Sequence, residues 1–168
     1  MYLEINEKYG SFDSELARKE KNDCVVRSVA SAADITYRTA HKFCKEFFGR
    51  EDKRGTNSMN IATQMLFAEV SGIEIGRKKF SIRVLGTGEI KNRYKLKGKV
   101  IFRKKTLKSF IDSHKIGTYL VMIANHALTV KEGEVYDWRS NNSKPTTKVM
   151  AAYELIEKDT SVQLNLFE

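Results

Sequence analysis

The chain has 168 residues, of which 41% are hydrophobic, so it is long enough to fold as one domain with a buried core. It has no run of about 18 apolar residues, and its start lacks a basic segment followed by an apolar run, which argues against a membrane span or a secretory signal and favours a cytoplasmic protein. Thirty Lys and Arg residues against 21 Asp and Glu residues give a net charge of +9, which favours contact with nucleic acid or with an acidic protein surface.

The first 22 residues show little apolar periodicity beyond Tyr2, Leu3 and Ile5, and we expect a strand or arm followed by a loop. A clear helix signal follows at about residues 24 to 33, where Asn22 and Asp23 can cap the first turn. Its apolar side chains recur at the spacing of one buried helix face: Val25, Val26, Val29, Ala30 and Ala33.

Two more helices are predicted in the first half of the chain. One can be capped by Asp34 or Thr36 and ends at Gly49, and a polar loop follows over residues 50 to 57. The other opens at Ser58 and ends at Gly72. We expect its apolar residues to point inward: Ile61, Met65, Leu66, Ala68 and Val70.

The pattern changes to strands after Gly72. A strand is predicted around Phe80, Ile82, Val84 and Leu85, a turn at Gly86 to Gly88, and a short helix from Leu107 to His114. Four strand-like segments then follow in the manner of an antiparallel meander: TYLVMIA, HALTVKEG, EVYDWRS and KVMAAYELI. Helices first and strands later predict an α+β protein, with N-terminal helices packed on a C-terminal antiparallel sheet. We expect one globular domain over residues 1–158 and a tail over 159–168.

A basic stretch lies between the predicted turn and the short helix and contains no acidic residue. Its charges alternate at period two in KNRYKLKGK, so a strand here would carry one wholly positive face that could follow phosphates or contact an acidic protein, with Tyr94 available to stack. The alternative is a solvated edge strand protected by lysines. The basic residues are Lys91, Arg93, Lys95, Lys97, Lys99, Arg103, Lys104 and Lys105.

The two cysteines, Cys24 and Cys44, are expected to be free thiols, because the cytoplasm is reducing. Two cysteines and three scattered histidines do not suggest a structural metal site. We expect no metal and no cofactor, and we assign Cys44, His41 and His114 to the core or the surface.

Cys24 stands at the first turn of a predicted helix, where free amides and the helix dipole favour a thiolate. His126 begins one predicted strand and Asp137 lies near the end of the next, so the two can meet across a hairpin. The order of these three residues, together with helices first and sheet second, resembles that of papain-like cysteine peptidases.

The resemblance implies that His126 deprotonates Cys24, that Asp137 fixes the imidazole tautomer, and that a side chain near Asn22 completes an oxyanion hole. The glutamine usual in that family some residues before the nucleophile is absent, and Arg18 and Lys19 stand there instead. Two alternatives remain: a buried structural Cys24, or a papain-like scaffold that serves binding rather than catalysis.

The C-terminal segment Gln163-Leu164-Asn165-Leu166-Phe167 resembles the short peptide with which polymerases and repair proteins bind the bacterial sliding clamp. Burial of its three apolar side chains would contribute roughly 1.5–3 kcal/mol each before ordering costs, which corresponds to binding in about the micromolar range. The alternative is a final strand in which Val162, Leu164 and Leu166 alternate on the protein's own sheet.

A small basic protein with this tail and no polymerase, nuclease or ligase motif resembles the phage-encoded inhibitors of host sliding clamps, of the staphylococcal phage Twort type. The resemblance implies binding of the clamp, which is the DNA polymerase III beta subunit, failure of clamp loading, and arrest of host replication. A homodimer with two tails would match a two-fold ring, and contact with DNA would be secondary. The alternatives are a papain-like peptidase or isopeptidase and a DNA-binding accessory protein tethered to the replisome.

Overall fold

The computed structural model of the chain describes residues 5–6, 15–137 and 144–159. Its helices are α1 (Glu15–Lys19), α2 (Cys24–Ala33), α3 (Tyr37–Phe48), α4 (Ser58–Ser71), α5 (Thr87–Ile90) and α6 (Leu107–Ser113). Its strands are β1 (Ile5–Asn6), β2 (Ile73–Ile75), β3 (Lys78–Val84), β4 (Lys91–Leu96), β5 (Lys99–Lys104), β6 (Thr118–Ile123), β7 (His126–Lys131), β8 (Glu134–Tyr136) and β9 (Val149–Glu157). Within these residues no helix is long and apolar enough to cross a membrane.

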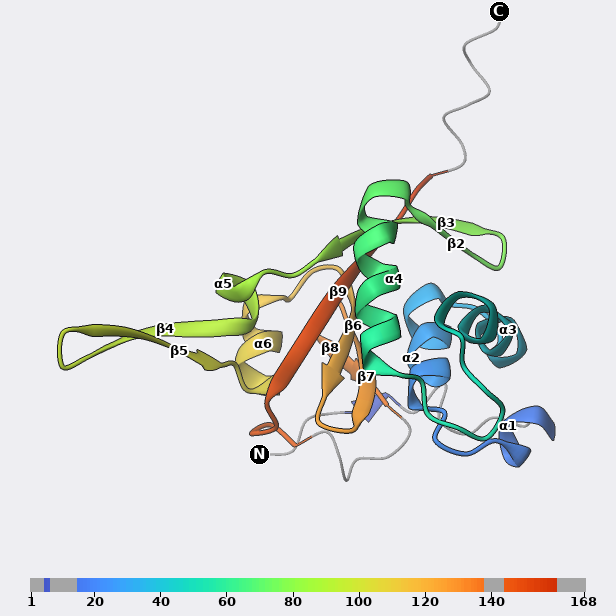
Figure 1. The fold of residues 1–168 in the computed structure, drawn as a ribbon, viewed down its shortest axis with the longest axis horizontal. Coiled ribbons are helices and arrows are strands. Elements are labelled where there is room, and N and C mark those ends of the chain that lie inside the picture. The colour runs from blue at the N-terminus through green and yellow to red at the C-terminus, as the bar shows by residue number, and fades with distance from the viewer. Residues whose placement is uncertain (1–4, 7–14, 138–143, 160–168) are drawn as a thin grey trace, which may run out of the picture.

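The central sheet has the strand order β1-β8-β7-β6-β9-β3-β2 (Figure 1). Six of these strands are antiparallel to their neighbours, and β1 pairs in parallel with β8 at the edge. The predicted meander is confirmed for β6, β7 and β8, whereas β9 crosses back to lie between β6 and β3. The predicted α+β class is therefore confirmed in the form of N-terminal helices packed against an antiparallel sheet.

Helix α2 is the centre of the helical layer, because every residue from Val25 to Ala33 is buried. Alanine and serine make up much of this helix, and their small side chains let it pack closely between α3 and the sheet. The opposite face of the sheet is covered by α6, whose Leu107 and Phe110 are fully buried. Strand β6 serves both layers, since Leu120 faces the α2 side and Val121 faces α6.

Side-chain caps begin α3 and α4, whereas the cap predicted for α2 is wrong, because Asp23 at its N-cap makes no capping hydrogen bond. The predicted bounds of α2 and α4 are confirmed, and α3 is capped by Thr36, whose side chain accepts a hydrogen bond from the Thr39 amide. Gly49 ends α3 with a left-handed φ of 66°, which glycine adopts without steric cost. Asn57 caps α4 by accepting from two backbone amides.

Several local predictions are wrong. Leu66 and Val70 do not point inward: they are 56% and 92% exposed, because α4 packs on the sheet through a narrow stripe of Ile61, Met65 and Ala68. The expected N-terminal loop contains α1, and the turn expected at Gly86 to Gly88 begins the short helix α5. The periodicity of apolar residues predicts a helix. It does not show which of two apolar stripes on that helix is buried.

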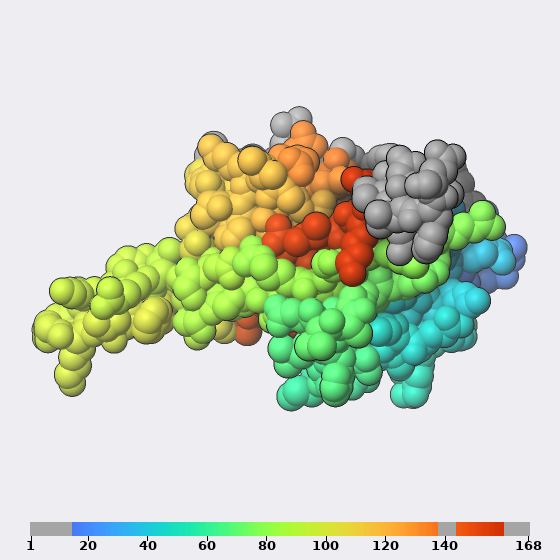
Figure 2. Space-filling model, turned by 90° about the horizontal axis from the view of Figure 1, so that it is seen from above, coloured from blue at the N-terminus to red at the C-terminus, as the bar shows by residue number. Residues whose placement is uncertain are grey.

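The basic stretch forms a hairpin, β4–β5, that is a sheet of its own. Figures 1 and 2 show it standing away from the rest of the molecule. Its register places Phe102 beside Arg93 and Val100 beside Lys95. The expected wholly positive face is therefore wrong, because the partner strand adds apolar side chains to it.

Candidate functional site

Cys24 is the first residue of α2 and is partly exposed. The residue before it, Asp23, occupies the N-cap position, but its side chain makes no capping hydrogen bond. That carboxylate instead accepts from Arg27 Nε (2.9 Å) and from the Tyr37 hydroxyl (2.7 Å), both buried. Because Asp23 turns away, its carboxylate does not cover the amide groups at the start of the helix beside the Cys24 thiol.

His126 and Asp137 form a buried pair on the sheet beside α2. His126 Nε2 lies 2.8 Å from Asp137 Oδ2, and their side chains are 6% and 3% exposed. His126 begins β7 and Asp137 follows directly after β8, which pairs with β7 in antiparallel register. The hairpin therefore brings the two residues together in the way the sequence predicts.

A second set of hydrogen bonds fixes α2 on β7. Thr129, which is fully buried, donates from its hydroxyl to the Ser28 carbonyl oxygen at 2.7 Å. Ser28 lies one helical turn after Cys24 and donates from its hydroxyl to the Cys24 carbonyl oxygen at 2.8 Å. These contacts fix α2 on the strand that His126 begins, and Cys24 and His126 line the same cleft.

The charge state of His126 follows from these neighbours. Burial alone would lower its pKa, but the hydrogen bond to Asp137 and the neighbouring Cys24 side chain raise the pKa to about 9. His126 is therefore an imidazolium at neutral pH, with the Asp137 carboxylate beside its Nε2.

The Cys24 thiol opens into a cleft of about 1360 Å³ between the helices and the ends of β6, β7 and β9. Asn22 and Asn125 line it, both exposed and both with left-handed φ angles of 53° and 55°. The loop before α4 forms a further wall with Gly55 and Thr56. Of these four cleft residues, the sequence pointed only to Asn22. Asn125 was not predicted, although it directly precedes the candidate histidine, His126.

Arg18 lines the same cleft. It is one of the two residues, with Lys19, that the sequence comparison with papain-like peptidases places where that family would be expected to have a glutamine. A guanidinium carries five N–H donors and a fixed positive charge, and it can hydrogen-bond a developing oxyanion.

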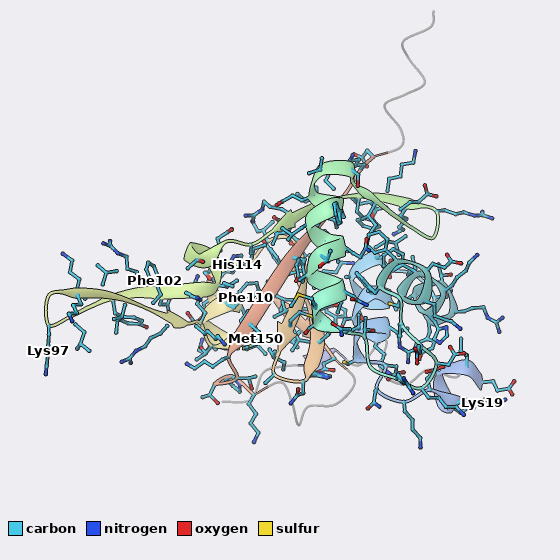
Figure 3. All side chains as sticks on the ribbon, in the orientation of Figure 1. Lys19, Lys97, Phe102, Phe110, His114 and Met150 are labelled. Atoms are coloured by element: carbon cyan, nitrogen blue, oxygen red, sulfur yellow. The ribbon has the colours of Figure 1, made fainter. Side chains whose placement is uncertain are left out.

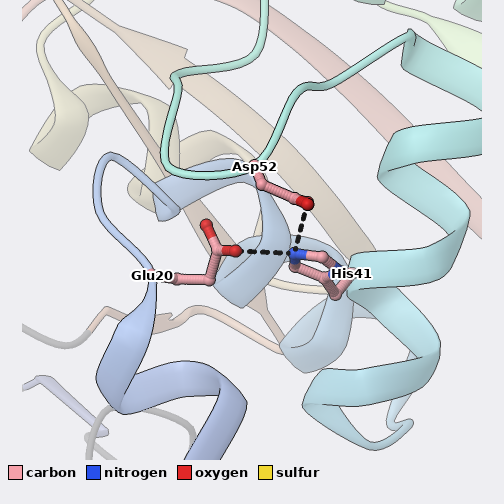
Figure 4. Close-up of side chains that lie close together, drawn as sticks. All are labelled: Glu20, His41 and Asp52. Carbon is pink, nitrogen blue, oxygen red and sulfur yellow. Dashed lines mark hydrogen bonds and ion pairs between the residues drawn. The ribbon is translucent and has the colours of Figure 1, made fainter.

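A second histidine cluster lies close by and joins α1, α3 and the loop after α3. Figure 4 shows His41 with Glu20 and Asp52 on either side of its ring nitrogen, at 3.1 Å and 3.7 Å from Nε2. Arg50, whose side chain is fully buried, donates to Glu20 at 2.7 Å and lies 3.2 Å from the same His41 nitrogen. Burial alone would raise the pKa of Glu20, but Arg50, the Lys53 amide and His41 lower it to about 2.

The oxygen and nitrogen atoms of Glu20, His41 and Asp52 lie within 4.8 Å of one another, as metal ligands do. The residues nevertheless fit a metal poorly, because Arg50 already supplies a buried positive charge to Glu20 and Lys45 lies 2.9 Å from Asp52. A divalent ion would be repelled by both. The cluster is better explained as a buried ion pair that ties α1 to α3.

Two further candidate groups, Cys44 and His114, are structural. Cys44 is fully buried, and burial raises the pKa of its thiol to about 12, which removes the thiolate needed for reactivity. His114 stacks on Phe110 with ring centroids 4.2 Å apart. Gln163, Leu164, Asn165, Leu166 and Phe167 lie outside the described residues.

Comparison of the chain with protein-family models, with curated proteins and with solved structures finds no match. The function is therefore inferred from the chain's own residues: Cys24, His126 and Asp137 in the structure, and the C-terminal peptide in the sequence.

Proposed function

We propose that Cys24, His126 and Asp137 form the active site of a papain-like cysteine hydrolase that cleaves peptide or isopeptide bonds. The observation that carries this proposal is the buried His126, which is hydrogen-bonded to Asp137, lines the same cleft as the Cys24 thiol, and has its pKa raised in part by that thiol. A nucleophile, a base and a group that orients the base thus lie together beside one cleft.

The first half of the reaction forms a thioester. The Cys24 sulfur attacks the carbonyl carbon while its proton resides on His126, and the carbonyl oxygen becomes an oxyanion. The Cys24 amide at the start of α2, Asn22 and Arg18 are the donors that can stabilise this oxygen. The C–N bond then breaks, and His126 gives its proton to the leaving amine.

The second half releases the acid. A water molecule loses a proton to His126 and attacks the thioester carbonyl carbon. The C–S bond breaks, the carboxylic acid leaves, and the proton taken from water stays on His126, which restores the starting imidazolium. Asp137 keeps the imidazole in one orientation throughout, because its carboxylate holds Nε2 at 2.8 Å and leaves the other ring nitrogen, Nδ1, as the atom that can face the thiol.

The test is covalent trapping of the full chain with a peptidyl vinyl sulfone, followed by intact mass measurement and peptide mapping. The proposal predicts a single adduct on Cys24, loss of that adduct in His126→Ala, and no adduct on Cys44. Equal labelling of wild type and His126→Ala would contradict it, since the base would then play no part.

We propose as a second function that the C-terminal peptide docks on the bacterial sliding clamp. The supporting observation is the sequence of Gln163 to Phe167, which matches the clamp-binding peptide at four specified positions. Occupation of the partner pocket by this peptide would deny the clamp to its loader and to polymerase, and so inhibit host DNA replication. A homodimer with two tails would gain roughly 10²–10⁴ in avidity on a two-fold ring.

The clamp proposal is tested by binding of a purified bacterial sliding clamp to the full chain and to a chain that ends at Val162. We expect micromolar or tighter binding by the full chain and at least about ten-fold weaker binding by the truncated one. Inhibition of clamp loading by Cys24→Ala at the wild-type level would show that clamp occupation acts without the hydrolase. Equal binding by full and truncated chains would contradict docking by the tail.

A further inference from the structure

The β4–β5 hairpin is a strongly charged surface that the two functions above do not use. Eight basic residues lie between Lys91 and Lys105, and no acidic residue lies among them. Large apolar side chains stand exposed between the charges: Tyr94 is 45%, Leu96 54%, Val100 41% and Phe102 52% exposed. Exposed aromatic and aliphatic groups among cations mark a binding surface.

Cations occupy both faces of this ribbon. The register pairs Lys91 with Lys104 on one face and Leu96 with Lys99 on the other. Figure 3 shows side chains leaving the ribbon on both sides, with Lys97 at the turn and Phe102 along the shaft. Such a ribbon presents positive charge in two opposite directions at once.

We propose that the β4–β5 hairpin inserts into a groove of duplex DNA. A two-stranded ribbon fits the major groove, which is about 12 Å wide and is flanked by a phosphate backbone on each side. Cations on both faces can then reach both backbones. An acidic protein surface would contact one face and leave the other unpaired.

The aromatic residues add a contact that phosphate binding alone does not need. Arg103 lies with its guanidinium carbon 5.7 Å from the centre of the Tyr94 ring, so both side chains are partly ordered before binding. On the opposite face Phe102 and Val100 stand beside Arg93 and Lys95. Apolar groups in this position can contact thymine methyl groups on the groove floor.

The experiment measures anisotropy of a fluorescent 20-base-pair duplex of mixed sequence with the full chain at several salt concentrations. We expect binding whose logarithm falls linearly with the logarithm of salt concentration. A variant in which Lys95, Lys97 and Lys99 are all changed to Gln should bind at least about ten-fold more weakly at low salt, with a slope smaller by about two to three. The matching change to Arg should retain binding, which shows that charge rather than hairpin folding is measured.

The matched control changes three exposed lysines elsewhere, Lys42, Lys53 and Lys79, to Gln. It removes the same charge, so the proposal predicts a smaller loss of affinity than the hairpin variant shows. Equal losses in the two variants would overturn the proposal, because binding would then follow net charge alone. Tighter binding to single-stranded DNA of the same length, or to polyglutamate, would overturn the choice of partner.

Discussion

Two histidines of this protein have nearly the same surroundings, and we propose different roles for them. His126 and His41 are each 7% exposed, and each has a carboxylate oxygen close to its Nε2, at 2.8 Å from Asp137 and 3.1 Å from Glu20. The third neighbour separates them. His126 shares a cleft with the Cys24 thiol, whereas His41 faces the buried guanidinium of Arg50.

A buried histidine paired with a carboxylate is therefore not sufficient to identify a catalytic site. A thiol beside the ring gives the imidazole a proton to exchange with a nucleophile. A guanidinium beside the ring completes an ion pair and closes the position to a ligand or a metal. We accordingly assign catalysis to the first cluster and stability to the second, and the following changes test that division.

The largest effect is expected at the nucleophile. Cys24→Ala should reduce the rate of peptide cleavage by at least about 10³-fold, and His126→Ala should cost a similar amount because the residues act as a unit. Cleavage of a peptide library, followed by mass spectrometry, measures the rates. The control Cys44→Ala removes the buried thiol and should retain activity, and loss of activity in both cysteine variants would make the Cys24 effect uninformative about catalysis.

Changes in the second cluster, around His41, should alter the stability of the protein. Arg50→Ala leaves Glu20 as an uncompensated buried charge and should lower the free energy of unfolding by about 3–5 kcal/mol. Urea unfolding followed by circular dichroism measures this loss. Arg54→Ala is the matched control, because Arg54 and Glu51 form an exposed pair, 75% and 68% exposed, worth less than about 1 kcal/mol. A loss at Arg50 no greater than at Arg54 would refute the structural role of the cluster.

The pH dependence of stability should reveal the His126–Asp137 pair. The pKa of His126 is raised from 6.5 to about 9, so its contribution is fully present below about pH 6.5 and is lost as pH rises through 9. The full loss corresponds to about 3 kcal/mol. Unfolding measured from pH 6 to 9 should show this decrease, and Asp137→Asn should flatten it. An identical pH profile in that variant would mean that Asp137 does not hold the proton on His126.

The smallest effect on stability is expected when a metal ion is added. Zn²⁺ added in modest excess should leave the melting temperature of the protein unchanged, because Arg50 and Lys45 oppose a divalent ion at Glu20, His41 and Asp52. A rise that is lost in His41→Ala would contradict the assignment of this cluster to stability alone.

The bounds of the three main helices were predictable from local chemistry, and the place of β9 in the sheet was not. Thr36, Gly49 and Gly72 mark helix ends through caps and backbone conformations that depend only on neighbouring residues. The place of β9 between β6 and β3 depends on pairing between distant segments, which no local pattern encodes. The exposure of Leu66 and Val70 likewise depends on which side of α4 meets the sheet.

The candidate site was predictable in its three chemical groups and not in its surroundings. Spacing and residue type predict that Cys24 lies at the start of a helix. They also predict that His126 and Asp137 meet across a hairpin. Asn125 and Thr56 line the cleft through loops, and loop geometry is set by the whole fold. The contact of Arg50 with Glu20 was likewise not predictable, because the two residues are 30 positions apart in the chain.

The most direct test of the central claim is the rate of Cys24 alkylation by iodoacetamide at pH 7 in wild type and in His126→Ala, with adducts mapped by mass spectrometry. If His126 activates the thiol, wild-type Cys24 should react at least about ten-fold faster than Cys24 in the variant. Equal rates in the two proteins would show that His126 does not activate the Cys24 thiol, and this result would contradict the hydrolase assignment.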